Sequence, residues 1–163
     1  KLKQINSPWH IQFRNKWLGT NTDTTSNKLF DWTKADDANI RHFSGTATYT
    51  TQFNLSNKDL KAPLYVEFEH VNNLAKVWLN GVELQTLWTK PYRVALSDVA
   101  KSGANTLKVE VTNTWTNQLL HQYQKAPSER ATWELVDVLS DMGDVVPSPS
   151  GLYGEAWITR DSE

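Results

Sequence analysis

Residues 74–84 read LAKVWLNGVEL, and this stretch decides the fold. Ala75, Val77 and Leu79 fall on every second position, which is the period of a half-buried strand. Asn80-Gly81 follows directly and precedes a second apolar run. An Asn-Gly pair between two such runs is the strongest short hairpin signal, because both central turn positions need a positive φ. The stretch therefore predicts a β-hairpin with a two-residue type I′ turn.

The same alternation recurs along the chain and predicts further short strands. The composition, with 8 Trp, 5 Tyr and 5 Phe in 163 residues, also favours strands. We expect a single all-β domain over residues 1–163, a β-sandwich with jelly-roll topology. The strand-like runs are 9–13, 43–55, 64–69, 107–112 and 152–158.

Two segments do not fit the strand pattern. Residues 14–42 are polar and without a clear period, and a connection this long is expected to drape over the fold. Its anchors are expected to be Leu29, Phe30, Trp32 and Ile40. Residues 128–139 are the only stretch that we expect to be helical, with Ser128 as the N-cap, although Trp133 and Leu135 also alternate as in a strand.

The composition excludes several classes of protein. There are 17 basic and 18 acidic residues, so the chain lacks the basic surplus of a nucleic-acid-binding protein. No run approaches 18 apolar residues, so no transmembrane helix is expected. The absence of cysteine excludes disulfides, thiolate metal sites and a cysteine nucleophile. The chain starts at Lys1 without a signal-peptide pattern, so we expect a processed or excised piece of a longer protein.

The sequence contains no recognisable catalytic motif. It lacks G-x-S-x-G, H-E-x-x-H and P-loop patterns, and its four histidines are not at metal-ligand spacing. Glu67 and Glu69 share one strand face about 7 Å apart, a separation like that of glycosidase carboxylates. Neighbours on one strand would flank a sugar poorly, however. We therefore expect no catalytic residues, no metal centre and no cofactor in this chain.

Two acidic loops are candidates for binding a structural calcium ion. Residues 141–144 read DMGD and resemble half of a calcium loop, but they fail its spacing. Asp36-Asp37 is the other candidate. The alternative is that these carboxylates are solvated loop residues.

The informative cluster is rich in aromatic and amide side chains. Flat rings stack on the C–H faces of sugars, whereas amides and Arg pair with sugar hydroxyls. We therefore expect a carbohydrate site at Trp88, Tyr92, Arg93, Trp115 and Asn117. The alternative is structural: the Trp rings would be core anchors, and Asn113 would form a local Asx turn.

Six motifs in order resemble a known family. They are GTATY (45–49), AKVWLNG (75–81), WTKPYR (88–93), GANTL (103–107), VTNTWTN (111–117) and SGLYG (150–154). Together they are similar to the galactose-binding-like jelly roll of glycoside hydrolase family 2 and its relatives. The last two, with LFDW (29–32), resemble the C-terminal sandwich of large bacterial α-L-rhamnosidases. Residues 118–122 read QLLHQ, where that branch usually has R-L-I-G-D.

The resemblance implies a non-catalytic ancillary domain of a bacterial glycoside hydrolase, extracellular or periplasmic. Its partners would be carbohydrate and the catalytic domain of the parent chain. The alternatives are a free-standing carbohydrate-binding module, a purely structural domain packed on a catalytic barrel or acting as an adaptor, and a small complete enzyme. An exposed apolar patch would favour packing. A concave site rimmed by Trp, Arg and Asn would favour sugar binding.

Overall fold

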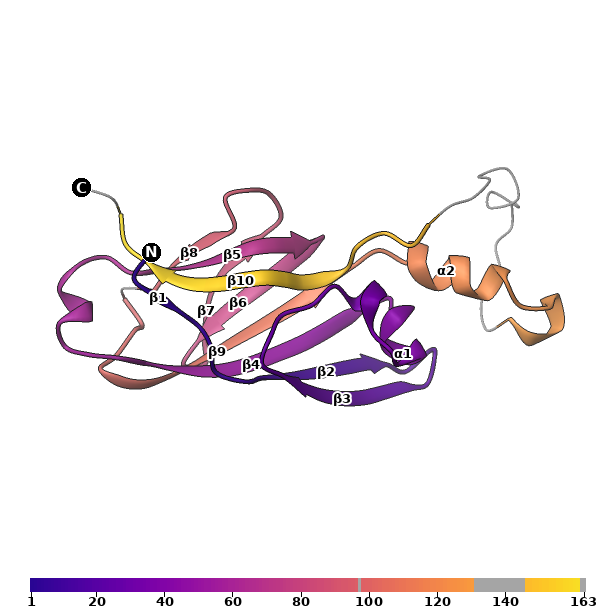
Figure 1. The fold of residues 1–163 in the computed structure, drawn as a ribbon, viewed down its shortest axis with the longest axis horizontal. Coiled ribbons are helices and arrows are strands. Elements are labelled where there is room, and N and C mark those ends of the chain that lie inside the picture. The colour runs from indigo at the N-terminus through magenta and orange to yellow at the C-terminus, as the bar shows by residue number, and fades with distance from the viewer. Residues whose placement is uncertain (97, 131–145, 162–163) are drawn as a thin grey trace.

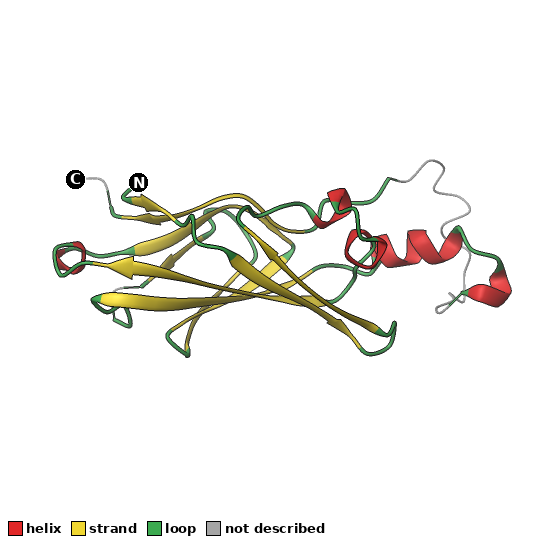
Figure 2. Cartoon of the chain, turned by 60° about the horizontal axis from the view of Figure 1, so that its bottom comes forward, coloured by secondary structure: helices red, strands yellow, loops and turns green. Residues whose placement is uncertain are grey.

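Two antiparallel sheets lie face to face in the computed structural model, which describes residues 1–96, 98–130 and 146–161 (Figures 1 and 2). The smaller sheet has the order β1 (Lys3–Gln4), β10 (Gly151–Thr159), β5 (Tyr65–Asn72), β8 (Arg93–Ala95). The larger has the order β3 (Thr20–Ser26), β2 (Trp9–Asn15), β4 (Thr46–Leu55), β9 (Gly103–Thr112), β6 (Leu74–Leu79), β7 (Val82–Leu87). The predicted all-β sandwich is confirmed.

Short helices lie at the two ends of the sandwich. The α-helices are α1 (Ala38–Arg41) and α2 (Thr116–Tyr123), and the 3-10 turns are η1 (Trp32–Lys34), η2 (Asp59–Lys61) and η3 (Pro127–Glu129). Helix α2 extends beyond one end, and both termini lie toward the other (Figure 1). No helix in the described part of the chain is long and apolar enough to cross a bilayer.

The predicted hairpin is confirmed at the β6–β7 connection. Leu79 pairs with Val82, which leaves a two-residue turn. Asn80 has φ 52° and Gly81 has φ 87°, so both turn positions are left-handed as a type I′ turn requires. The Asn80 side chain also donates to Asn105 Oδ1 at 2.9 Å, which ties the turn to β9.

The core between the sheets is centred on aromatic rings. Trp32 is fully buried, and its indole N–H donates to the Tyr49 hydroxyl at 2.5 Å. Phe13 and Phe43 meet the Trp32 ring edge-on, with centroids 5.3 and 5.4 Å away. Edge-to-face packing of this kind stabilises a core beyond simple area burial.

The long segment 14–42 drapes over the sandwich as expected, with Leu29, Trp32 and Ile40 buried and Phe30 half-buried. It is not structureless, however, because residues 20–26 form strand β3 along the edge of the larger sheet. An edge strand has little surface to bury, so its sequence TNTDTTS shows no apolar alternation. Its β-branched Thr residues were the available signal.

The expectation that residues 128–139 are the only helical stretch was wrong, because helices occur elsewhere in the chain. The structure has α2 at Thr116–Tyr123, whereas most of 128–139 lies outside the described residues. Helix α2 buries the polar residues Asn117, Gln118 and Gln122 rather than an apolar stripe. It therefore lacks the period from which an amphipathic helix is normally predicted.

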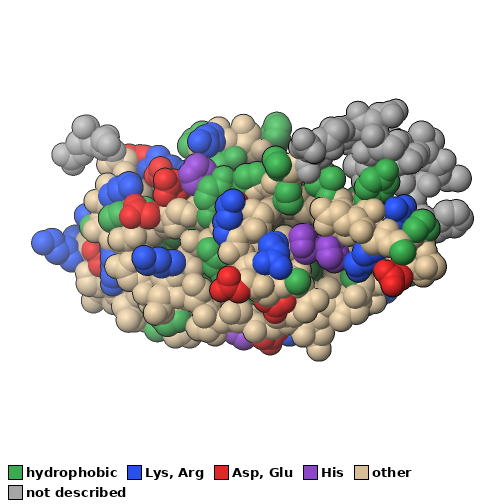
Figure 3. All heavy atoms as spheres, turned by 45° about the vertical axis from the view of Figure 1, so that its right-hand side comes forward, with side chains coloured by type: hydrophobic (Ala, Val, Ile, Leu, Met, Phe, Trp, Pro, Cys, Tyr) green, Lys and Arg blue, Asp and Glu red, His purple; other side chains and the backbone are tan. Residues whose placement is uncertain are grey.

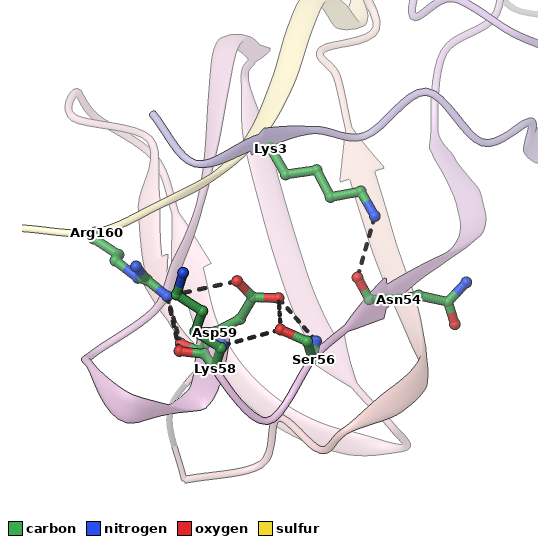
Figure 4. A network of polar contacts seen from close by, with 6 residues as sticks. All are labelled: Lys3, Asn54, Ser56, Lys58, Asp59 and Arg160. Carbon is green, nitrogen blue, oxygen red and sulfur yellow. Dashed lines mark hydrogen bonds and ion pairs between the residues drawn. The ribbon is translucent and has the colours of Figure 1, made fainter.

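A polar network closes the sandwich near the termini (Figure 4). Asp59 accepts from the Ser56 backbone N–H at 2.8 Å and from its hydroxyl at 2.7 Å, and these bonds lower the pKa of Asp59. Arg160 donates to the carbonyls of Lys58 and Asp59 at 3.3 and 3.0 Å. Lys3 donates to the Asn54 carbonyl at 3.3 Å. These bonds join the end of β4 and the loop after it to residues near the two ends of the chain.

Candidate functional site

The strand registers bring two of the predicted site segments to one end of the sandwich. Ala75 pairs with Leu87 on one side and with Val111 on the other. Trp88 directly follows Leu87, and Trp115 lies four residues after Val111. The β7–β8 loop and the end of β9 are therefore neighbours across strand β6.

Exposed apolar side chains mark this end. Trp88 is 74% exposed, Leu74 40% and Trp115 39%. In the described residues Trp88 has no hydrogen bond, ion pair or ring contact. We call Leu74, Trp88 and Trp115 the apolar patch. Figure 3, which brings this end of the molecule forward, shows hydrophobic side chains gathered over its upper part.

Arg93 lies on the outer face of the smaller sheet and is already engaged. Its guanidinium stacks over the Tyr65 ring, 3.7 Å from the centroid, and pairs with Asp161 at 2.8 Å. Tyr65 donates its hydroxyl to the same carboxylate at 2.9 Å. The hydrogen bonds from Tyr65 and Arg93 lower the pKa of Asp161, and the bond to Asp161 raises the pKa of Tyr65. A sugar would have to compete with this carboxylate.

Asn117 is buried in the first turn of α2, and its amide is used at both ends. Its Nδ2 donates to the Ser148 carbonyl at 2.8 Å and to Ser150 Oγ at 3.0 Å. Its Oδ1 accepts from the Ser148 backbone N–H at 2.8 Å. Asn117 therefore holds the segment that leads into β10 against α2.

Asn113 works in the same way, four residues earlier. Its Nδ2 donates to the Phe43 carbonyl at 2.8 Å and to Ser150 Oγ at 3.1 Å, and its Oδ1 accepts from the Gly45 N–H at 2.9 Å. The expected structural role is present, but the local Asx turn is not. The asparagine joins three loops that are far apart in sequence.

Tyr92 is half-buried against the core, and its carbonyl accepts from the Phe68 N–H at 2.9 Å. Its hydroxyl has no hydrogen-bond partner among the described residues. Of the five predicted residues, Trp88, Trp115 and the Tyr92 hydroxyl thus remain free to meet a ligand or another domain. Their role in sugar binding stays a prediction.

Two of the carboxylates considered for catalysis or calcium, those of Glu69 and Asp37, have hydrogen-bond partners within the fold. Glu69 accepts from the Glu155 N–H at 2.9 Å, and Glu67 lies opposite Arg93. Asp37 caps α1 by accepting from the Asn39 N–H at 2.8 Å. In the described residues no three His, Cys, Asp or Glu side chains gather as a metal site would require. Residues 141–144 lie outside the described residues.

Sequence spacing gave no sign of a histidine pair beside α2. The rings of His42 and His121 stack with centroids 4.1 Å apart and planes 9° from parallel. Burial lowers the pKa of His42, with a further contribution from His121, and burial also lowers the pKa of His121. The pair joins the end of α1 to α2, and the lowered pKa values favour the neutral form of both rings.

Known proteins match both the sequence and the fold. Residues 20–143 match the family model described as glycosyl hydrolase 2 galactose-binding domain-like. A curated "Putative beta-glucuronidase" of Formosa agariphila is 36% identical over 114 residues, which is 69% of this chain and 10% of that protein.

Solved structures of glycoside hydrolases contain domains with the same fold as this chain. A rhamnosidase from Novosphingobium sp. PP1Y has a TM-score of 0.84 and 29% identity over 96% of this chain and 15% of its own. The Ruminococcus gnavus β-glucuronidase has a TM-score of 0.57 and 21% identity over 69% of this chain and 21% of its own, a likeness of fold alone. The chain thus spans about a tenth of the curated relative and 15% of the rhamnosidase. The resemblance inferred from the six motifs is confirmed.

Proposed function

The chain belongs to the glycosyl hydrolase 2 galactose-binding-like domains, and from this premise we propose that it is a non-catalytic β-sandwich of a larger bacterial glycoside hydrolase. Its role is to pack against the rest of the parent protein through the apolar patch. The parent protein is extracellular or periplasmic and acts in polysaccharide degradation. The 163-residue chain itself hydrolyses no glycoside, and an aryl α-L-rhamnoside is the substrate on which to test this.

The exposed apolar patch is the observation that carries the packing role. Large aromatic side chains at the surface indicate an interface when they cluster, because water solvates them poorly. Beside them, the amides of Asn113 and Asn117 are fully used within the domain. These two amides are therefore not available to a ligand, whereas the Trp88 and Trp115 rings are exposed, and this suits another protein surface better than a hydroxylated ligand.

Substitution of Trp88 in two contexts tests the packing role. Trp88→Glu should lower the melting temperature of the parent protein, because it places a charge in the contact. The same change should leave the melting temperature of the 163-residue chain unaltered. Trp17→Glu is the matched control, since Trp17 is also exposed, at 78%, but lies outside the patch. An unaltered parent protein in both variants would contradict the packing role.

Weak sugar binding by the same aromatics is the second candidate function. Trp88 and Trp115 offer stacking faces and the Tyr92 hydroxyl is unpaired among the described residues, whereas Arg93 and Asn117 would first have to leave their present partners. A titration with neutral oligosaccharides, followed by Trp fluorescence, addresses it. Millimolar binding that Trp88→Ala abolishes, with the fold intact, would support this function over packing alone.

A further inference from the structure

A cavity of about 660 Å³ lies away from the apolar patch and shares no residue with it. Three segments enclose it: the chain before β2, the loop after β3, and the middle of β10. Its floor is apolar and includes Ile5, Trp9 and Leu29, each of them buried. The volume falls in the range of small-molecule sites, roughly 300–1,000 Å³.

A bulge in β10 shapes the cavity. The pairing of β10 with β5 shifts between Tyr153 and Ala156, and Gly154 within this shift has φ 81°. A Cβ on Gly154 would lie 2.7 Å from Glu69 Cδ, so a larger residue at this position would displace the Glu69 carboxylate. The Glu69 carboxylate then accepts the Glu155 backbone N–H at 2.9 Å. Such bulges re-aim side chains beside functional sites.

Backbone contacts fix the other two walls to this bulge. The Ile5 N–H donates to the Ala156 carbonyl at 2.9 Å, and Leu29 forms an isolated β-bridge with Gly154. The three walls thus meet at neighbouring positions of one strand. A cavity whose walls are held by the backbone loses little conformational entropy when a ligand enters.

The rim carries polar side chains that have no other task. Asn6, Asn27 and Lys28 are exposed, and their side chains have no hydrogen-bond or ion-pair partner among the described residues. The amides can each donate and accept. Free amides at a cavity mouth contrast with Asn113 and Asn117, whose amides are bonded at both ends.

Glu155 adds an oriented acceptor to the rim. Its Oε1 accepts from Gln4 Nε2 at 3.2 Å, and its Oε2 accepts from the Trp157 indole at 2.8 Å. Lys1 lies 3.7 Å from the same oxygen, which balances the charge of the carboxylate. Because Lys28 also lines the cavity, its residues carry no strong excess of charge of either sign.

We propose that this cavity binds a neutral sugar, one ring resting in the cavity and its hydroxyls paired with Asn6, Asn27 and Glu155. A hydroxyl donates and accepts as an amide does, so the two are complementary. The balanced charge of the rim disfavours ionic ligands. The inference is independent of the packing role, because a sugar here would touch no residue of the apolar patch.

Titration of the 163-residue chain by amide NMR tests the proposal. The probes are the methyl glycosides of glucose, galactose, mannose and rhamnose, with glucuronic acid as the charged comparison. At least one neutral glycoside should shift the amides of Leu29, Gly154 and Glu155 in a saturable way. Asn27→Ala should weaken that binding about three- to tenfold, as the loss of one ligand hydrogen bond does.

The matched control is Asn57→Ala, because Asn57 is also exposed but does not line the cavity. It should leave the affinity unaltered, and an unaltered melting temperature in both variants shows that the fold is intact. Three outcomes would overturn the proposal. They are the absence of saturable shifts with every neutral glycoside, shifts confined to Trp88 and Trp115, and an affinity that the double variant Asn6→Ala/Asn27→Ala leaves unaltered.

Discussion

Replacement of Gly151 by alanine measures how tightly the first residue of β10 is packed on the core. Gly151 has φ 90°, a conformation that costs an alanine about 1–2 kcal/mol. An added Cβ would also lie 2.5 Å from Trp32 Cε2 and 2.7 Å from Cδ1. The indole cannot easily move away, because Tyr49 holds its N–H and two Phe rings flank it. Overpacking of a core typically costs a further amount of about 1–3 kcal/mol.

Gly103 provides the control that separates the two costs. Its φ is 84°, nearly that of Gly151, but no atom lies within 4 Å of a Cβ built there. We expect Gly103→Ala to lower the free energy of unfolding by about 1–2 kcal/mol and Gly151→Ala by about 2–5 kcal/mol. Urea unfolding followed by far-UV circular dichroism gives both values. For a chain of this size, each kcal/mol corresponds to about 2–4 °C in the melting temperature.

A third variant tests whether the Trp32 ring is the cause. In a Trp32→Leu background the clash is removed, so Gly151→Ala should cost no more than Gly103→Ala does. The coupling between the two substitutions is then the packing term itself. Equal destabilisation by Gly103→Ala and Gly151→Ala in the native background would refute the reasoning, since it would mean that the core yields to the added methyl group.

Three further predictions use the same unfolding measurement. Gly81→Val should cost at least about 1 kcal/mol, because a β-branched residue resists positive φ, and an unchanged midpoint would contradict the turn. Asn113→Ala should cost about 2–4 kcal/mol by leaving buried backbone groups unpaired, whereas exposed Thr114→Ala should cost little. His42 and His121 have pKa values below the ordinary 6.5, so the unfolded chain takes up protons first. Stability should therefore fall as the pH drops from 6.5 through the lowered native pKa values, and a His42→Gln/His121→Gln variant should lose this dependence.

The parts of the fold that follow from local rules could be predicted from the sequence. The hairpin at Asn80-Gly81 depends on two adjacent residues, and the central strands show the period of a sheet buried on one face. Edge strand β3 escaped prediction because burial no longer imposes that period. Helix α2 escaped because its buried side chains are amides, and that of Asn117 is bonded to the segment before β10.

The candidate site was harder to predict because its polar residues act over long separations. Asn117 meets Ser148 and Ser150, which lie 31 and 33 residues further along the chain. Arg93 meets Asp161 near the C-terminus. Neither pairing has a sequence period, so residue type alone made both side chains look free. The cavity was missed for the same reason, since its three walls come from both ends of the chain.

Strand β10 lines the cavity, and Ser150 just before it is bonded to Asn113 and Asn117, which flank Trp115 of the apolar patch. The packing of β10 predicts that the two surfaces act independently. Gly151 at its start is wedged against Trp32, and Gly154 at the bulge is wedged against Glu69. Two sites couple only through an element with two arrangements that both sites bias. A strand held at both points offers one arrangement. Asn27→Ala should therefore weaken sugar binding without altering the parent protein's melting temperature. Trp88→Glu should lower that melting temperature without altering sugar binding. In the double variant each effect should have its single-variant size, so that the result is the sum of the two. A departure from that sum would show that β10 moves when the cavity fills.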